Sequence, residues 1–226
     1  MAEKALIVGA GSGLSACLAR LFHNEGMDVA VAARRVDNIQ PLADEVGGKA
    51  YRCDVAEADD VAALFDAVDA DMGAPDIVVF NPSKRSRGPL VDLDPEEVRQ
   101  ALLVTCYGGF LVAQQAAERM LKRGSGSILL TGASAGVKGY PKSAPFAMGK
   151  FGLRGLAQSM ARELHPQNVH IGHFVIDGSI APPGESGDND NRLSPESIAE
   201  TYLQFHRQHR SAWAWEIELR PWVETF

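Results

Sequence analysis

The chain has 226 residues, of which 46% are hydrophobic and 23% are charged, and its formal net charge is −7. This composition is typical of a globular chain that can bury a sizeable core as one domain. The negative net charge argues against a broad surface for nucleic acid or membrane, because those partners need clustered positive charge. Small molecules are therefore the expected partners.

The sequence predicts a cytoplasmic protein without disulfides or a metal site. Residues 1–8 lack the long apolar region of a signal peptide, and no segment approaches the roughly 18 apolar residues of a membrane span. Cys17, Cys53 and Cys106 are far apart and lack CxxC or HxxxH spacing, so neither disulfides nor zinc is indicated.

Short β-rich runs alternate with helical patterns along most of the chain. The predicted order is strand Lys4–Val8, helix Leu14–Glu25, strand Asp28–Ala33, helix Asn38–Val46, strand Lys49–Cys53, helix Asp59–Asp71, strand Asp76–Phe80, helix Pro95 to about Lys122, strand Ser127–Thr131, helix Ala144–Leu164 and strand His170–Ile176. This alternation indicates parallel strands joined by right-handed crossovers. The predicted fold class is α/β, a Rossmann-type doubly wound parallel sheet with helices on both faces and its ligand at the carboxyl ends of the strands.

The remaining residues predict a loop followed by one more helix and strand. Residues from Gly178 to about Ser194 are rich in Gly, Asp, Asn and Pro, which favours a mobile substrate loop. Ser194 has the position of a helix N-cap with Pro195 at the first helical position, and a C-terminal helix and strand are expected over 194–220. We expect one domain over residues 1–226.

A glycine-rich turn follows the first strand and opens the first helix. It reads Gly9-Ala10-Gly11-Ser12-Gly13-Leu14-Ser15. Backbone amides at such a helix start face the pyrophosphate of a dinucleotide, and glycine allows its close approach. A tight turn without ligand is the alternative, and the position directly after the first strand favours the dinucleotide.

Polar residues follow the next three strands at the same predicted edge of the sheet. Arg34 and Arg35 stand where arginine accommodates the 2′-phosphate of NADP and an acidic residue binds the 2′-hydroxyl of NAD. Asp54-Val55 and Asn81 follow the third and fourth strands. The alternative is that each of these residues is a solvated turn residue. Their position at the same edge as the glycine turn favours a cofactor site, and the arginine pair favours NADP(H) over NAD(H).

The whole constellation resembles the short-chain dehydrogenase/reductase family over about residues 4–182. The TGxxxGxG turn of that family is similar to Val8-Gly9-Ala10-Gly11-Ser12-Gly13-Leu14-Ser15, and its NNAG segment to Phe80-Asn81-Pro82-Ser83. The resemblance implies that Asp54 approaches the adenine amino group, that Val55 contacts its ring, and that the Ile180 backbone meets the carboxamide. Gly9, Gly11, Ser12, Gly13, Leu14, Arg34, Arg35, Asn81 and Lys150 complete the implied cofactor site.

The catalytic half departs from the family pattern. Family members use serine, tyrosine, lysine and asparagine, and the resemblance places Ala133 at the serine, Phe146 at the tyrosine and Thr105 at the asparagine. Of the four residues, only Lys150 is retained. A phenyl ring carries no proton, and removing a general acid typically costs about 10²–10⁴-fold in rate.

Other side chains are candidates for the lost roles. Tyr140 precedes the catalytic helix and is a candidate substitute acid, with a packed loop anchor as the alternative. Ser134 adjoins the vacated serine position, although neighbouring residues on a strand point differently. His173 lies in an apolar strand and is expected to be a buried structural histidine.

Two functions from different classes follow from this pattern. The first is an NADP(H)-dependent oxidoreductase of unknown carbonyl or alcohol substrate, with weak or unusual activity that depends on Lys150 and Tyr140. The alternative is a catalytically inactive cofactor-binding sensor or scaffold subunit; a different reaction on the same fold has no specific support. The resemblance also implies a homodimer or homotetramer formed through the long helices.

Overall fold

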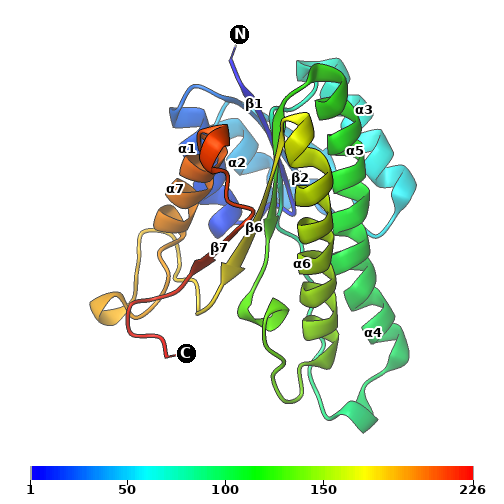
Figure 1. Ribbon diagram of the computed structural model, residues 1–226, viewed down its shortest axis with the longest axis vertical. Coiled ribbons are helices and arrows are strands. Elements are labelled where there is room, and N and C mark those ends of the chain that lie inside the picture. Colours follow the sequence, from blue (N-terminus) through cyan, green and yellow to red (C-terminus); the bar gives the residue numbers. More distant parts are fainter. Residues whose placement is uncertain (1, 226) are drawn as a thin grey trace.

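A seven-stranded, all-parallel sheet forms the centre of the computed structural model, which describes residues 2–225 (Figure 1). The strand order is β3-β2-β1-β4-β5-β6-β7. The strands are β1 (Lys4–Val8), β2 (Asp28–Ala33), β3 (Lys49–Arg52), β4 (Ile77–Phe80), β5 (Gly126–Thr131), β6 (Val169–Ile176) and β7 (Glu216–Leu219). The order reverses direction at β1, which is the arrangement of a doubly wound α/β sheet.

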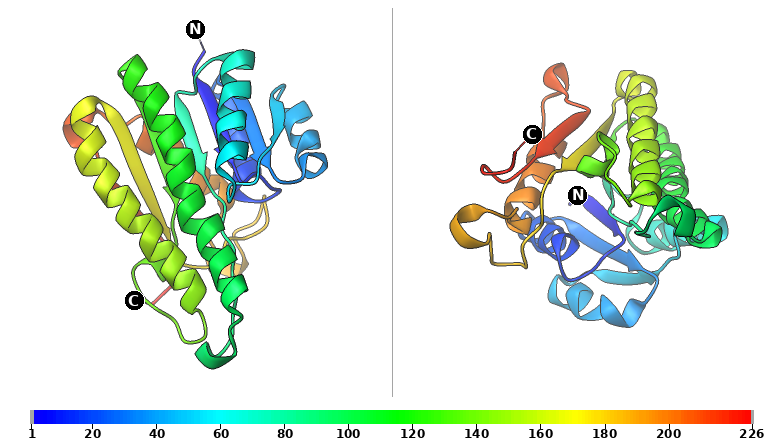
Figure 2. Two further views of the ribbon diagram at one scale, coloured as in Figure 1. Left: turned by 90° about the vertical axis from the view of Figure 1, so that its right-hand side faces the viewer. Right: turned by 90° about the horizontal axis from the view of Figure 1, so that it is seen from below.

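Helices cover both faces of this sheet, as Figures 1 and 2 show. They are α1 (Leu14–Asn24), α2 (Gln40–Glu45), α3 (Ala58–Met72), α4 (Pro95–Leu102), α5 (Gly108–Arg123), α6 (Ala144–Leu164) and α7 (Pro195–His206). Side chains from α1, α2 and α7 pack in one buried cluster, and those from α3, α5 and α6 pack in the other. Alternate residues of β1 divide between the two, because successive strand residues point to opposite faces. The predicted fold class is confirmed.

The long helix predicted from Pro95 to about Lys122 is interrupted. A π-helical segment, Leu103–Tyr107, separates α4 from α5, and such segments are frequent at functional sites. Thr105, inside the segment, is fully buried, and its hydroxyl accepts a hydrogen bond from the Lys84 backbone amide (3.1 Å). The segment therefore anchors the loop that follows β4.

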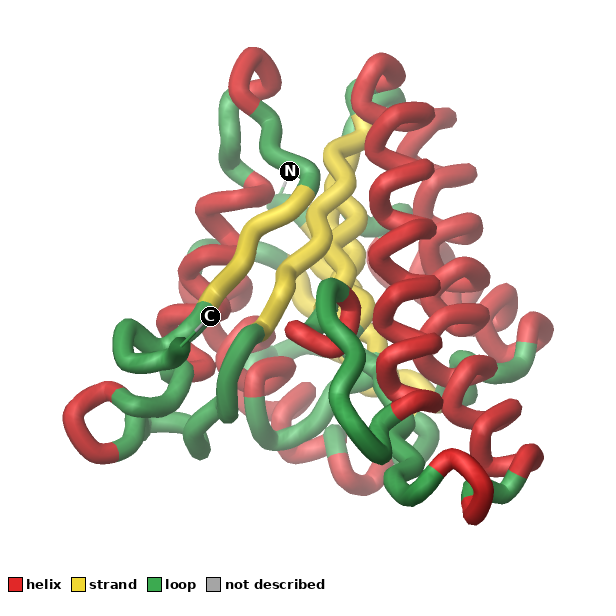
Figure 3. The backbone as a smooth tube through the Cα atoms, turned by 60° about the horizontal axis from the view of Figure 1, so that its bottom comes forward, coloured by secondary structure: helices red, strands yellow, loops and turns green. Residues whose placement is uncertain are grey.

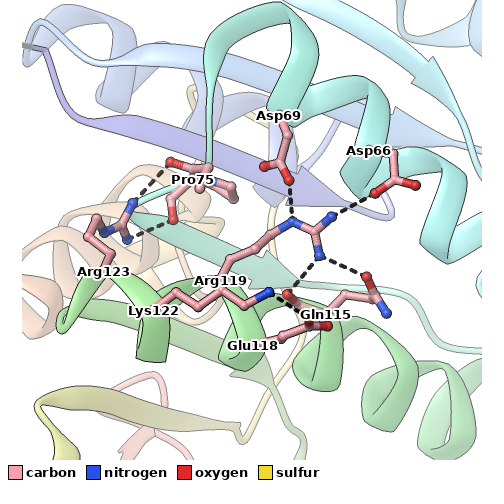
Figure 4. Close-up of polar contacts among 9 residues, drawn as sticks. Asp66, Asp69, Pro75, Gln115, Glu118, Arg119, Lys122 and Arg123 are labelled. Atoms are coloured by element: carbon pink, nitrogen blue, oxygen red, sulfur yellow. Dashed lines mark hydrogen bonds and ion pairs between the residues drawn. The ribbon is translucent and has the colours of Figure 1, made fainter.

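A cluster of ion pairs joins α3 to α5 on one face of the sheet (Figure 4). The Arg119 guanidinium contacts Asp69 at 2.5 Å and Asp66 at 2.9 Å, and it also bonds to Gln115 on its own helix. Arg119 is 12% exposed and Asp69 is 34% exposed, so this contact is better shielded from water than the contact to Asp66, which is 78% exposed. They fix the helix layer that supports β4 and β5.

The C-terminal part follows the prediction closely. The Ser194 hydroxyl accepts a hydrogen bond from the Ser197 amide at the start of α7, with Pro195 as the first helical residue. β7 (Glu216–Leu219) adds to the sheet beside β6 and lies within the range 194–220 in which the last helix and strand are expected. Within residues 2–225, no helix is long and apolar enough to cross a membrane.

Candidate functional site

A cleft of about 660 Å³ lies at the carboxyl ends of β1 to β4. The loops at this end of the sheet come forward in Figure 3. The cleft brings together eight residues predicted for the cofactor site with seven others. Its lining is Gly9, Ala10, Gly11, Ser12, Ala33, Arg34, Arg35, Asn38, Cys53, Asp54, Val55, Asn81, Pro82, Ser83 and Val104.

The first glycine of the turn is required by two separate features. Gly9 has a φ of +81°, which side-chain-bearing residues rarely adopt, and a Cβ there would lie 2.6 Å from the Pro82 ring. Gly11 and Gly13, in contrast, face open space. The turn thereby passes close under the loop after β4 while leaving its outer side free for a ligand.

A chain of hydrogen bonds ties the glycine turn to β4. The Asn81 side-chain amide donates to the Ser15 hydroxyl (2.7 Å), which donates to the Gly9 carbonyl (3.2 Å). Ser15 stands where the family pattern has its last glycine, and its side chain is almost fully buried. This serine is therefore accommodated as a bridge between the first and fourth strands.

Two exposed cations stand at the end of β2. In the part of the chain that the structure describes, neither the Arg34 nor the Arg35 guanidinium has a hydrogen-bond or ion-pair partner. Across the cleft, one oxygen of Asp54 accepts from the Ala56 amide (3.1 Å), which orients this carboxylate. The guanidinium groups are donors that fit the phosphate of a phosphorylated ribose, and the oriented carboxylate is an acceptor that fits an adenine amino group.

Four of the predicted cofactor residues, among them Lys150 on α6, lie outside the lining of this cleft. Gly13 and Leu14 form the start of α1, which has no side-chain cap on its free amides. Ile180 lies on the loop after β6, where its carbonyl accepts from Arg192 (2.9 Å). The Ile180 carbonyl is thus occupied within the protein, and its amide is the backbone group left for a ligand.

A second cavity, of about 630 Å³, lies at the carboxyl ends of β5 and β6. It contains both Ala133 and Phe146, the residues at the positions of the family serine and tyrosine. The candidate substitutes Ser134 and Tyr140 line the same cavity. The full lining is Arg85, Arg87, Gly88, Ala133, Ser134, Ala135, Tyr140, Pro141, Lys142, Ser143, Phe146, Ile176 and Gly178.

Lys150 is buried beside this cavity on α6. Only 3% of it is exposed, and its Nζ donates to the Thr131 carbonyl at 2.6 Å. Its Nζ lies 5.8 Å from the centre of the Phe146 ring. Burial, together with the positive charge of Arg85, lowers the pKa of Lys150 to about 7. The amine is thus poised to exchange a proton near neutral pH.

Tyr140 is 43% exposed at the mouth of the second cavity. The Lys138 ammonium lies 5.8 Å from the centre of its ring, and the Tyr140 hydroxyl and Asp177 raise the pKa of that ammonium. The structure therefore brings this predicted substitute acid to the same cavity as the vacated positions.

His173 is fully buried in β6, as predicted for a structural histidine. Its Nδ1 lies 2.9 Å from a Glu216 oxygen, and burial lowers its pKa to about 4. Its Nε2 has no hydrogen-bond partner within residues 2–225. The imidazole is therefore neutral at pH 7 and joins β6 to β7.

Three cationic residues in the second cavity were missed by the sequence prediction. Arg85 and Arg87 lie on the loop after β4, and Lys142 lies before α6. The available signal was the run Lys84-Arg85-Ser86-Arg87, which directly follows the fourth strand and its Asn81. Asn38 in the first cleft was also missed, because nothing in its local sequence distinguishes it from a turn residue.

Comparisons with known proteins agree with this geometry. A family model described as enoyl-(acyl carrier protein) reductase matches residues 9–204. Tropinone reductase-like 1 of Erythroxylum coca is 34% identical over 178 residues, which cover 74% of this chain and 64% of that protein. The matches cover 66%, 64% and 63% of the first three curated relatives, just under two thirds of each.

Two solved structures match nearly the whole chain. A short-chain dehydrogenase from Rhodopseudomonas palustris is 33% identical, with a TM-score of 0.84 over 97% of this chain and 99% of that one. A metagenomic short-chain oxidoreductase in complex with NADP is 26% identical, with a TM-score of 0.85 over 98% of each chain. Both combine sequence identity above 25% with a shared fold.

Proposed function

Because the chain belongs to the short-chain dehydrogenase/reductase family, we propose that it is an NADP(H)-binding oxidoreductase with weak or unusual activity on a carbonyl or alcohol substrate. The observation that carries this proposal is the cleft at β1 to β4. It joins the glycine turn, two guanidinium groups that have no partner among residues 2–225 and an oriented Asp54 in one ligand-sized space.

The preference for NADP(H) is argued from charge. Arg34 and Arg35 follow β2, where the ribose of a dinucleotide lies in this fold class, and the acidic residue of the cleft lining, Asp54, follows β3 instead. A 2′-phosphate would pair with these guanidinium groups through charge-assisted hydrogen bonds. One metagenomic relative of similar fold binds NADP, which supports the same assignment.

The chain's own residues suggest how a proton is moved. When bound, NADP(H) supplies or accepts the hydride. Reduction of a carbonyl requires a proton donor to the substrate oxygen, and the Phe146 ring has no proton to donate. Lys150, with a pKa near 7, is one source of that proton, and the Tyr140 hydroxyl at the cavity mouth is the other. Ser134 lines the cavity and offers a neutral hydrogen-bond donor to the substrate.

A second candidate is a cofactor-binding sensor or scaffold without catalysis. Ala133, Ala135 and Phe146 form a small apolar cluster of their own in the second cavity. Neither vacated position therefore presents a hydroxyl to a substrate. This cluster favours the inactive alternative, whereas the retained, buried Lys150 favours the enzyme.

The first experiment measures NADPH and NADH binding by calorimetry, together with NADPH oxidation in the presence of a panel of aldehydes, ketones and quinones. Micromolar NADPH binding with turnover supports the enzyme, and the Tyr140→Phe variant then tests the substitute acid. Binding without turnover across the panel supports the sensor. Absence of binding to either cofactor contradicts both functions.

A restored active site is the sharper prediction. Phe146→Tyr together with Ala133→Ser is expected to create or increase carbonyl reduction by at least about 10²-fold, because a general acid and an oxyanion donor are returned to the cavity. Phe146→Leu is the matched control and should give no gain. No gain in the double variant, with NADPH binding intact, would indicate a cavity repurposed for another role.

We also propose that the described residues form one domain and that two or four copies assemble. One sheet spans the chain from β1 to β7 without a break. Tyr107, Phe110, Met148 and Phe151 expose between 41% and 51% of their surface on the helices around α5 and α6. A partner copy seated on this face would remove that apolar surface from water.

A further inference from the structure

The second cavity is lined by three cations and by no carboxylate. Arg85, Arg87 and Lys142 contribute positive charge, while the other lining residues are apolar, hydroxyl-bearing or glycine. We call this space the cationic pocket. Within residues 2–225, none of the three cations has an aspartate or glutamate at ion-pair distance. This concentration is unusual for a chain with a net charge of −7.

Two acidic residues that adjoin the pocket in sequence or through Lys84 form ion pairs with cations outside its lining. Glu97 pairs with Lys84 at 2.9 Å, just outside the pocket. Asp177 pairs with Lys138 at 3.5 Å and with Arg220 at 3.4 Å. Carboxylates therefore neutralise Lys84, Lys138 and Arg220, which surround the pocket. Among the described residues, no carboxylate pairs with the three cations that line it.

Arg85 is held in a defined place in the pocket. Its guanidinium lies 4.2 Å from the centre of the Phe146 ring, a distance at which a cation and an aromatic face attract each other. Burial and the positive charge of Arg87 lower the pKa of Arg85, which shows that the two guanidinium groups repel each other. An anion between them would relieve that repulsion.

We propose that the cationic pocket binds an oxyanion group, a carboxylate or a phosphate, on the substrate, so that the substrate is a small anionic carbonyl compound or alcohol. Paired guanidinium groups bind such planar or tetrahedral anions through several N–H donors. Ser134, Tyr140 and Ser143 line the same space and add hydroxyl donors. Its volume of about 630 Å³ is that of a small-molecule site.

The position of the anion site adds a substrate class to the proposed function. That the substrate carries a carbonyl or alcohol group rests on the proposed oxidoreductase function. Arg85 faces Phe146, and Ala133 lines the same pocket, so the anion would bind beside the two vacated catalytic positions. A substrate anchored there by charge needs less binding from the lost serine and tyrosine hydroxyls. The anion site itself does not depend on cofactor binding and is testable alone.

The test measures binding of malonate and of inorganic phosphate by calorimetry to the protein and five variants. Arg85→Gln with Arg87→Gln is expected to weaken binding about tenfold to hundredfold, because charge-assisted hydrogen bonds are lost. Lys84→Gln, in the same loop but paired with Glu97, is the matched control and should bind like the wild type. Arg34→Gln reports any binding at the other cleft.

The melting temperature of each variant checks its folding. If the double variant unfolds, the single variants Arg87→Gln and Arg85→Lys replace it in the test. Arg85→Lys keeps the charge but loses the guanidinium fork. Loss of binding confined to the pocket variants supports the proposal, and the preferred probe distinguishes a carboxylate site from a phosphate site. Absence of binding at millimolar concentration, equal binding by all variants, or loss only in Arg34→Gln overturns it.

A second readout uses matched carbonyl probes with NADPH. 4-Carboxybenzaldehyde is expected to be reduced at least tenfold faster than its neutral methyl ester, and the double variant should abolish that difference. Equal rates for acid and ester overturn the substrate assignment. Absence of any turnover, with malonate or phosphate binding intact, contradicts the oxidoreductase function while the anion site stands, so the two failures are distinguishable.

Discussion

Lys150 is almost fully buried, and none of the described aspartates or glutamates lies at ion-pair distance from its amine. Its Nζ donates to the Thr131 carbonyl, and the positive charge of Arg85 acts on it across the Phe146 side chain. A charged ammonium is costly in such a place, because burial removes its hydration. The residue is retained beside a cavity in which Phe146 stands at the position of the family tyrosine, so the amine of Lys150 is a candidate proton donor.

Replacement of this amine should alter how stability depends on pH. The folded pKa of Lys150 is about 7 and its ordinary value is 10.5, so the unfolded chain binds more protons between these values. The contribution of Lys150 to the free energy of unfolding therefore rises with pH between 7 and 10.5. As pH falls back to 7, this contribution is lost. Lys150→Met removes that contribution.

Urea titrations at several pH values from 6 to 10 measure this effect. The difference in unfolding free energy between wild type and Lys150→Met should grow as pH rises. Lys122→Met removes an ammonium that is 73% exposed at the end of α5 and should keep the wild-type profile. A difference that is constant with pH would show that the buried amine keeps its ordinary pKa.

Arg34 carries the prediction on cofactor choice. Arg34→Gln should weaken NADP⁺ binding about tenfold to hundredfold, because a charge-assisted contact to the 2′-phosphate is lost, and should leave NAD⁺ binding unchanged. Calorimetry with both nucleotides measures the ratio. Arg162→Gln, an exposed change on α6, is the control. An equal loss for NADP⁺ and NAD⁺ would place Arg34 away from the 2′-phosphate.

The turn between β1 and α1 shows how one element sets the cofactor cleft. Its first glycine lies under the Pro82 ring, and the Ser15–Asn81 hydrogen bond connects the same turn to β4. Two neighbouring parallel strands thus share one connection at their carboxyl ends. Any side chain at Gly9 would separate the turn from the loop that leads to the second cavity.

Two glycines with the same backbone angle test this arrangement. Gly9 and Gly26 both have a φ of +81°, but only Gly9 has a neighbour within 4 Å of an added Cβ. Gly9→Ala and Gly26→Ala should each cost about 1–2 kcal/mol from the left-handed backbone. Gly9→Ala should lose about 1–3 kcal/mol more through overpacking against Pro82.

Thermal or urea unfolding measures both variants, and NADPH calorimetry follows the cleft. We expect weaker NADPH binding in Gly9→Ala alone. Equal destabilisation of the two variants would mean that the Pro82 loop moves aside without cost. Pro82→Ala in the Gly9→Ala background should recover part of the lost stability, since it removes the ring atoms nearest to the added Cβ.

At the level of the whole molecule, the exposed aromatic residues of α5 and α6 predict self-association. Phe110→Asp with Phe151→Asp should shift the protein to a smaller species in light scattering, because charge on an apolar interface is poorly solvated. Val223→Asp, on the C-terminal segment, changes a residue that is as exposed as Phe151 and is the control. An unchanged mass for the double variant would place any interface elsewhere.

The sequence alone predicted the order of strands and helices and the doubly wound fold class, and eight of the residues that it proposes for a cofactor line one cleft. Hydrophobic periodicity and glycine position are local signals, and the carboxyl ends of parallel strands must meet at one edge. The helix from Ala144 to Leu164 and its lysine were found for the same reason.

Only the tertiary structure decided which distant side chains share a space and which charges are balanced. The π segment at Leu103–Tyr107, the Ser15–Asn81 bridge and the burial of Lys150 arise from contacts between elements far apart in sequence. The cationic pocket is the clearest case. Arg85 and Lys142 are 57 residues apart, and a charge run in sequence carries no information about where its counter-charges lie.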